Sequence, residues 1–234
     1  MEFGGSQRLA CIVCVLTATT SVANAGTDRE ARQVYSKYTL CAAKHHPKDA
    51  EQVVLSNMQN DDVIKKHPAL ITPDCLDSGD LTLPGDFIRY GLAEALVRRD
   101  YSNGLPKDIG LAAPLTHMEV DEADYQPKPG QKLNPQRARE LERRKKEALG
   151  FRYLSIYGEC IARKDSTASL QLVLSVTDSD QERRAFEALR PQLGGCLMQG
   201  QTIAFDRAAL RGSIAMNLYR LAKAPRIPAA TKVQ

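Results

Sequence analysis

The sequence predicts a mostly α-helical protein made of two tandem homologous repeats, each closed by one disulfide and each containing one short extended segment. Three observations predict this class. Two stretches of the chain match each other at a nearly constant offset, apolar residues recur at the three- and four-residue spacing of a helix, and each matching stretch carries two cysteines.

Residues 1–25 predict a removable export signal. A short polar segment ends at Arg8, the apolar run Leu9–Leu16 follows, and Ala23-Asn24-Ala25 has the small-x-small pattern that a signal peptidase accepts. The apolar run is much shorter than the ~20 residues that span a bilayer. We therefore expect a soluble, periplasmic or secreted protein without a membrane span. Cys11 and Cys14 would be removed with the signal.

The internal repeat is the most informative pattern. Nine residues between Ser36 and Asp61 recur as the same residue type 119 positions later, and a Q-[VL]-V-L-S run is among them. The offset grows to 121 at the second cysteine and to 122 in the closing segment, as loop insertions would produce. We assign residues 26–101 to the first repeat, and residues 135–224 to a basic helix followed by the second repeat.

The segment between the repeats has a different composition. Prolines and glycines interrupt every periodic pattern in residues 102–134, which predicts a linker. Its acidic residues are expected to lie in a solvated loop. Residues 225–234 are assigned to a C-terminal tail. The acidic patch of the linker consists of Glu119, Asp121, Glu122 and Asp124.

Each repeat is expected to begin with two helices. Tyr38 and Cys41, like Tyr157 and Cys160, lie on an apolar helical stripe, and both tyrosines are expected to be core rings packed on a disulfide. Pro47, with acidic residues behind it, predicts the first turn of the next helix. The equivalent residues 169–176 alternate and could form a strand, but the first repeat favours a helix.

A third helix and a closing helix complete each repeat. In the second repeat, residues 180–193 predict a helix with one apolar face, and Ser179 or Asp180 could cap its start. In the first repeat, prolines shorten the equivalent helix. The brief extended segments are residues 81–83 and 203–205. The closing helices are expected to start at Gly85-Asp86 and at Asp206.

Four cysteines remain after removal of the signal, which predicts structural disulfides in an exported chain. Three pairings are possible. Duplication favours Cys41–Cys75 and Cys160–Cys196, because a single ancestral copy could only close on itself. Each bridge would enclose about 35 residues and stabilise the fold by roughly 3–4 kcal/mol. A redox pair is the alternative, but such pairs are usually a close C-x-x-C.

Composition and motifs exclude several classes of function. The net charge of +4 is too small for a nucleic-acid partner, and 6% aromatic residues without Trp do not favour stacking platforms. No phosphate-binding, dinucleotide or hydrolase motif occurs, and no serine has an identifiable base. Without such motifs we expect no cofactor. The adjacent His45 and His46 would point to different sides of a helix, so we expect no metal site.

Two groups of basic residues are candidate sites. Arg89 and Arg211 occupy the same place in both copies, inside mostly apolar helices, where each could be a structural arginine or a ligand contact. A basic run before the second repeat is typical of a solvated helix face with i,i+4 ion pairs, and alternatively of a contact with an anionic envelope polymer or a partner protein. This run comprises Arg137, Arg139, Arg143, Arg144, Lys145 and Lys146.

The pattern Y-x-x-C, then C-L-x-x-G, then L-R-G-x-[IL]-A and L-Y-R resembles a group of exported bacterial tandem-repeat proteins of unknown function. The second repeat carries it best, in Leu210-Arg211-Gly212-Ser213-Ile214-Ala215 and Leu218-Tyr219-Arg220, whereas Tyr90 replaces the glycine in the first. The resemblance implies compartment and architecture. The function expected is a non-enzymatic binding or structural module of the cell envelope; the alternative is a small, hydrolase-like enzyme with a site between the repeats.

Overall fold

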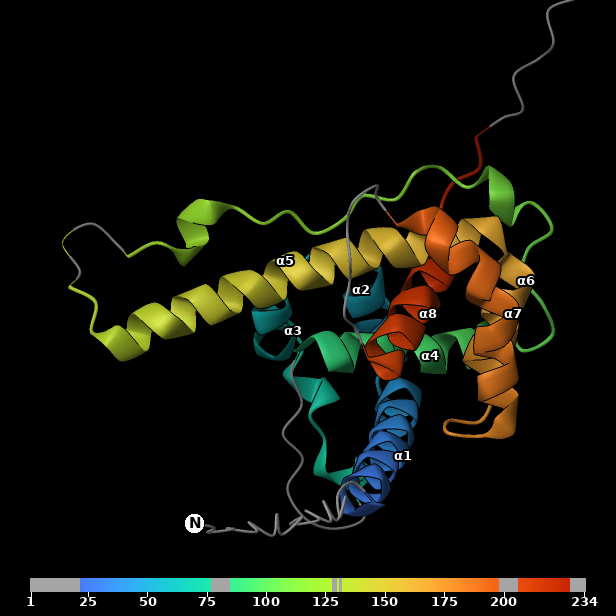
Figure 1. The fold of residues 1–234 in the computed structure, drawn as a ribbon, viewed down its shortest axis with the longest axis horizontal. Coiled ribbons are helices and arrows are strands. Elements are labelled where there is room, and N and C mark those ends of the chain that lie inside the picture. Colours follow the sequence, from blue (N-terminus) through green and yellow to red (C-terminus); the bar gives the residue numbers. More distant parts are fainter. Residues whose placement is uncertain (1–21, 77–84, 128–129, 131, 198–205, 228–234) are drawn as a thin grey trace, which may run out of the picture.

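The computed structural model describes residues 22–76, 85–127, 130, 132–197 and 206–227, and within them the regular structure is helical (Figure 1). The mostly α-helical class is therefore confirmed. The α-helices are α1 (Val22–His45), α2 (Pro47–Leu55), α3 (Asn60–Lys66), α4 (Gly85–Tyr101), α5 (Pro135–Lys164), α6 (Ser166–Leu174), α7 (Asp180–Cys196) and α8 (Arg207–Lys223).

Local signals set most helix starts. Pro47 opens α2, where its missing amide hydrogen costs nothing. Asp165, Ser179 and Asp206 each accept a hydrogen bond from a backbone amide in the first turn of α6, α7 and α8. The strand alternative for residues 169–176 is wrong, because α6 covers this segment as far as Leu174. The extended segments expected at 81–83 and 203–205 lie outside the described residues.

Each half contains one disulfide. In the first half it joins α1 to the 3-10 turn Pro73–Cys75, and in the second half it joins α5 to the end of α7. Cys41 bonds Cys75, and Cys160 bonds Cys196, with Cα–Cα distances of 5.6 and 5.8 Å. One disulfide per repeat is thus confirmed. A buried tyrosine lies three residues before the first cysteine of each pair. Tyr38 donates a hydrogen bond to the Leu70 carbonyl, and Tyr157 donates to the Leu193 carbonyl, both at 2.9 Å.

The two closing helices form the centre of the molecule. Helix α8 packs on both α4 and α5, and every residue from Leu210 to Ala222 is buried. Tyr90 of α4 and Gly212 of α8 meet at this contact, where a Cβ on Gly212 would lie 2.3 Å from the Tyr90 Cβ. These are equivalent positions of the two repeats. One of them must therefore be glycine, because the Cβ of the other already occupies the contact.

A second pair of equivalent contacts shows the same exchange. Where α4 meets α1, Gly91 faces Thr39; where α8 meets α5, Gly158 faces Ser213. In the first half the glycine lies on the last helix, α4, whereas in the second half it lies on the first helix, α5. Each helix pair therefore keeps one position without a side chain, which allows close backbone approach.

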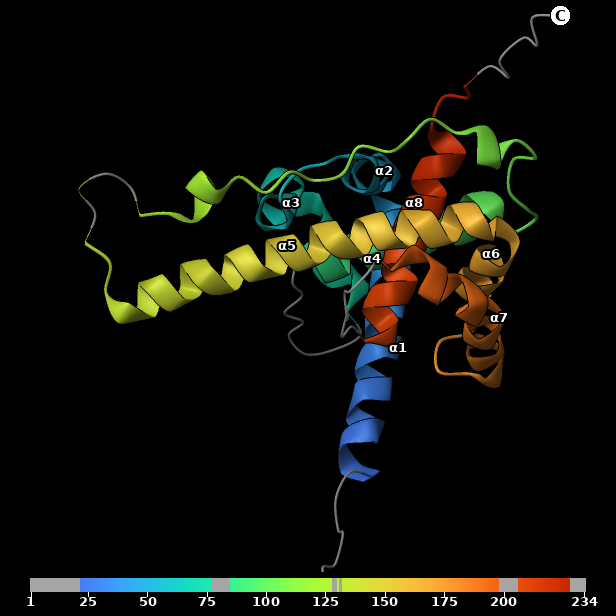
Figure 2. The ribbon, with the colours of Figure 1, turned by 45° about the horizontal axis from the view of Figure 1, so that its top comes forward.

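The connector between the halves runs back along α5 (Figure 2). Ile109, Ala112 and Met118 are buried, so the predicted linker contributes to the core. Arg163 of α5 donates to the carbonyls of Ala112 and Ala113 at 2.9 and 2.7 Å. The start of the predicted tail pairs with the same segment, because the Ala113 amide donates to the Pro225 carbonyl. The halves and their connector thus share one core.

Residues 1–21 of the predicted signal lie outside the described residues. Helix α1 begins at Val22 and so runs through the cleavage position expected after Ala25. Within the described part of the chain, no helix combines the length and apolarity that crossing a membrane requires.

Candidate functional site

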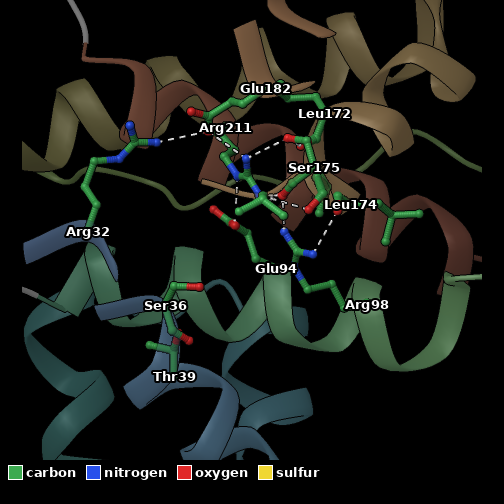
Figure 3. Close-up of polar contacts among 12 residues, drawn as sticks. Arg32, Ser36, Thr39, Glu94, Arg98, Leu172, Leu174, Ser175, Glu182 and Arg211 are labelled. Atoms are coloured by element: carbon green, nitrogen blue, oxygen red, sulfur yellow. Dashed lines mark hydrogen bonds and ion pairs between the residues drawn. The ribbon is translucent and has the colours of Figure 1, made fainter. Parts of the chain in front are cut away.

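Arg211 lies at the centre of a buried polar network between the two halves (Figure 3). Its Nε donates to Glu94 of α4 at 2.9 Å, and one terminal nitrogen donates to Glu182 of α7 at 2.6 Å. The other terminal nitrogen donates to the carbonyls of Val173 and Ser175, at 3.0 and 2.9 Å. Burial opposes the charge, but the two carboxylates outweigh it and raise the pKa of Arg211.

Glu182 extends this network to α1. The carboxylate oxygen that accepts from Arg211 also accepts from Arg32 of α1 at 3.1 Å, and the other oxygen accepts from the Asp178 amide at 3.0 Å. Asp178 has a φ of 59°, in the left-handed region, and also pairs with Arg32. Burial would raise the pKa of Glu182, but Arg211, the Asp178 amide and Arg32 together lower it.

Arg98 binds the same helix end from the opposite half. This α4 residue donates to the carbonyls of Leu174 and Ser175, at 2.9 and 2.6 Å, and no carboxylate of the described chain lies within ion-pair distance of it. The C-terminal carbonyls of α6 are thus bound by one arginine from each half. Cations at this end also complement the helix dipole. Burial, and then Arg211, lower the pKa of Arg98.

The first half repeats this arrangement without the carboxylates. Arg89 donates to the carbonyls of Ser56 and Met58, both at 2.7 Å, just beyond the end of α2. Arg220 of the other half donates to the Asn57 side chain at 2.8 Å. Arg89 is almost fully buried and has no ion-pair partner among the described residues, so burial lowers its pKa to about 10. Both predicted arginines therefore bind helix ends.

A pocket of about 710 Å³ opens beside the Arg211 network. Tyr35 of α1 and Phe87 of α4 form apolar walls, and their rings meet edge to face with centroids 6.0 Å apart. Val176 and Ala208 of the second half complete the lining. Both halves are therefore needed to form this pocket. Its size and mostly apolar lining are those of a small-molecule site.

The charged groups at the pocket are mainly cationic. Among the described residues, Arg32, Lys37, Arg98 and Arg211 line it, against one carboxylate, Glu94. Of these cations, Lys37 and Arg98 have no carboxylate within ion-pair distance in the described chain. Together with Asp178 and Glu182 next to it, the pocket has one more cation than carboxylates. This surface therefore favours anionic over cationic ligands.

A second polar cluster joins the connector to α5. The two ring nitrogens of His117 lie 2.9 Å from the Ser155 hydroxyl and 2.7 Å from a Glu159 oxygen. These are the residue types of a serine hydrolase triad. His117 could act as a base for Ser155, a pairing that the sequence alone did not reveal. Ser155 is only 1% exposed, however, and does not line the pocket. Glu159 also binds Arg163 and the Leu115 amide, which fixes the connector.

The basic run lies on the part of α5 that extends away from the body (Figures 1 and 2). Arg143 pairs with Glu140 and Glu147 on the same helix, as the spacing predicted. Arg144 pairs with Asp61, and Lys145 with Glu122 of the acidic connector segment. No carboxylate of the described residues lies within ion-pair distance of Arg137, Arg139 or Lys146.

The histidines occupy separate places. The Nδ1 atom of His67 lies 2.8 Å from an Asp49 oxygen, which ties the end of α3 to α2, whereas His117 belongs to the connector cluster. The rings of His45 and His46 are 6.5 Å apart. Among the described residues, no group of three histidine, cysteine or acidic side chains could hold a metal ion.

Comparison with known proteins gives no match: neither a family model, nor a curated protein, nor a solved structure is similar to this chain. The resemblance to exported tandem-repeat proteins stays a prediction. The candidate site therefore rests on its geometry.

Proposed function

We propose that the protein is an exported, non-enzymatic binding module that takes a small organic ligand in the pocket between its two halves. The observation that carries this proposal is the pocket itself, an apolar cavity of about 710 Å³ beside a fixed polar network. Its volume suits a small molecule better than a protein or polymer of the envelope. The buried ion pairs of Arg211 and the two disulfides provide a rigid frame for it.

Export is part of the proposal and agrees with the disulfides, because such bonds persist in oxidising compartments. The signal pattern ending at Ala25 supports it further. Cleavage after Ala25 would give a mature chain that begins at Gly26. Arg32 then remains in the mature protein and can close the pocket at α1.

The test uses N-phenyl-1-naphthylamine, an uncharged dye that fluoresces in apolar sites. We expect saturable binding by the oxidised mature protein. Ala31→Trp places a large ring at the pocket from an exposed position on α1, and should weaken dye binding at least ~tenfold by covering apolar surface that the dye contacts. Ala138→Trp, at an exposed position on α5 away from the pocket, is the matched control. Equal binding by both variants would contradict the proposal.

A hydrolase is the second candidate, favoured by the contacts of His117 with Ser155 and Glu159. The same preparations can be assayed with p-nitrophenyl butyrate, with Ser155→Ala as the comparison. Because the connector covers the Ser155 hydroxyl, we expect both proteins to hydrolyse the ester at the same background rate. Hydrolysis by the native protein that Ser155→Ala abolishes would favour the enzyme instead.

A further inference from the structure

We propose that the ligand of the pocket is a single-chain amphiphile with an anionic head, such as a long-chain carboxylate. This inference rests on the proposed function and specifies its ligand class. The walls of the pocket favour an apolar chain, its charged groups favour an anionic head, and its size favours a single chain.

The walls favour an apolar chain. Tyr35, Phe87 and Tyr90 provide aromatic surface, and Ala95 and Ala208 leave space between the helices. Val176 is 64% exposed at the rim, where contact with an apolar chain would remove it from water. Burial of apolar surface is favourable in proportion to its area, so contact of the chain with these walls is the main source of affinity.

The polar groups favour an anionic head. Glu94 already binds Arg211, and Asp178 and Glu182 already bind Arg32, so their charges are compensated within the protein. Lys37 is exposed on α1 at the pocket and has no such partner in the described chain. A carboxylate head that reaches Lys37 would meet a free ammonium group. A cationic head would meet one lining carboxylate, Glu94, which already pairs with Arg211.

The size of the pocket favours a single chain over a peptide helix. A three-turn helix about 10 Å in diameter occupies roughly 1,300 Å³, so only one face of it could enter a cavity of about 710 Å³. An extended peptide could not pair with a strand here, because the lining offers no strand edge in the described residues, so its backbone groups would depend on side chains alone. A hydrocarbon chain has no such groups to satisfy.

The experiment is displacement of bound N-phenyl-1-naphthylamine by two amphiphiles that differ by one carbon in the alkyl chain, dodecanoate and dodecyltrimethylammonium, below their micellar concentrations. We expect dodecanoate to displace the dye at a concentration at least ~tenfold lower. Lys37→Glu should weaken displacement by dodecanoate at least ~fivefold, because it reverses the charge that faces the head. Lys44→Glu, an exposed lysine on the same helix outside the pocket, should leave it unchanged.

The outcomes separate this inference from the proposed function. Equal displacement by the two amphiphiles, or equal loss in the two lysine variants, would overturn the anionic head while leaving the pocket in place. Binding of the dye without displacement by either amphiphile would overturn the ligand class. Failure of the native protein to bind the dye would overturn the proposed function and this inference together.

Discussion

Arg211 and Arg89 occupy equivalent positions in the two repeats and make similar hydrogen bonds, but they differ in their ion pairs. Each donates to carbonyls at the end of the short helix of its own half. Only Arg211 also binds carboxylates, Glu94 and Glu182. The matching arginines are visible in the sequence, but their partners are not. Glu94 lies 117 positions from Arg211, and no local pattern connects them.

The close contact of α4 with α8 gives a prediction at the residue scale. Gly212→Ala should lower the free energy of unfolding by roughly 1–3 kcal/mol, because its Cβ would lie 2.3 Å from the Tyr90 Cβ and overpacking outweighs the better helix propensity of alanine. Urea unfolding monitored by circular dichroism measures the change.

Gly150→Ala is the matched control for this prediction. Gly150 lies on α5, and a Cβ there would meet no atom within 4 Å, so this substitution should be neutral or stabilise by up to ~1 kcal/mol. Equal effects of the two substitutions would show that α4 and α8 do not pack as closely as described.

At the scale of elements, helix starts follow from local chemistry, but the connector does not. Ser179 and Asp206 cap helices where the sequence predicts them, because a cap needs only the next three residues. The proline-rich connector reads as a linker, yet it packs on α5 through Arg163 and Glu159. These contacts join residues more than forty positions apart, so no periodic pattern reveals them.

The junction of α7 with α1 and α8 gives a prediction for pH. The folded-state pKa of Glu182 lies below its usual value of 4.5, so the unfolded chain takes up the proton first as the pH falls. The stabilisation is therefore complete above that value and is lost progressively below it. At pH 7, Glu182→Gln should lower the free energy of unfolding by roughly 1.5–3 kcal/mol.

Urea unfolding of the native protein and of Glu182→Gln from pH 7 to ~3 measures this dependence. The difference between the two proteins should shrink as the pH falls. Glu187→Gln, on the exposed face of α7, should follow the native protein throughout. A difference that stays constant with pH would mean that the charge of Glu182 does not hold these helices together.

At the scale of the whole molecule, the two halves make reciprocal contacts. Arg98 of the first half binds the end of α6, and Arg220 of the second half binds Asn57, just beyond the end of α2. Equivalent units packed face to face make such paired contacts. The sequence predicts the two disulfides and the order of helices. The pocket could not be predicted, because it depends on how α1 and α4 meet residues of the other half.

The central claim is that this pocket holds a small ligand in the exported protein. Native mass spectrometry of protein recovered from its own compartment, without detergent, tests it most directly. We expect the native protein and Ala138→Trp to carry one added mass in the range of a single-chain amphiphile, and Ala31→Trp to carry much less of it because its ring takes up part of the pocket. Identical ligand-free masses, or the same adduct on all three proteins, would contradict the claim.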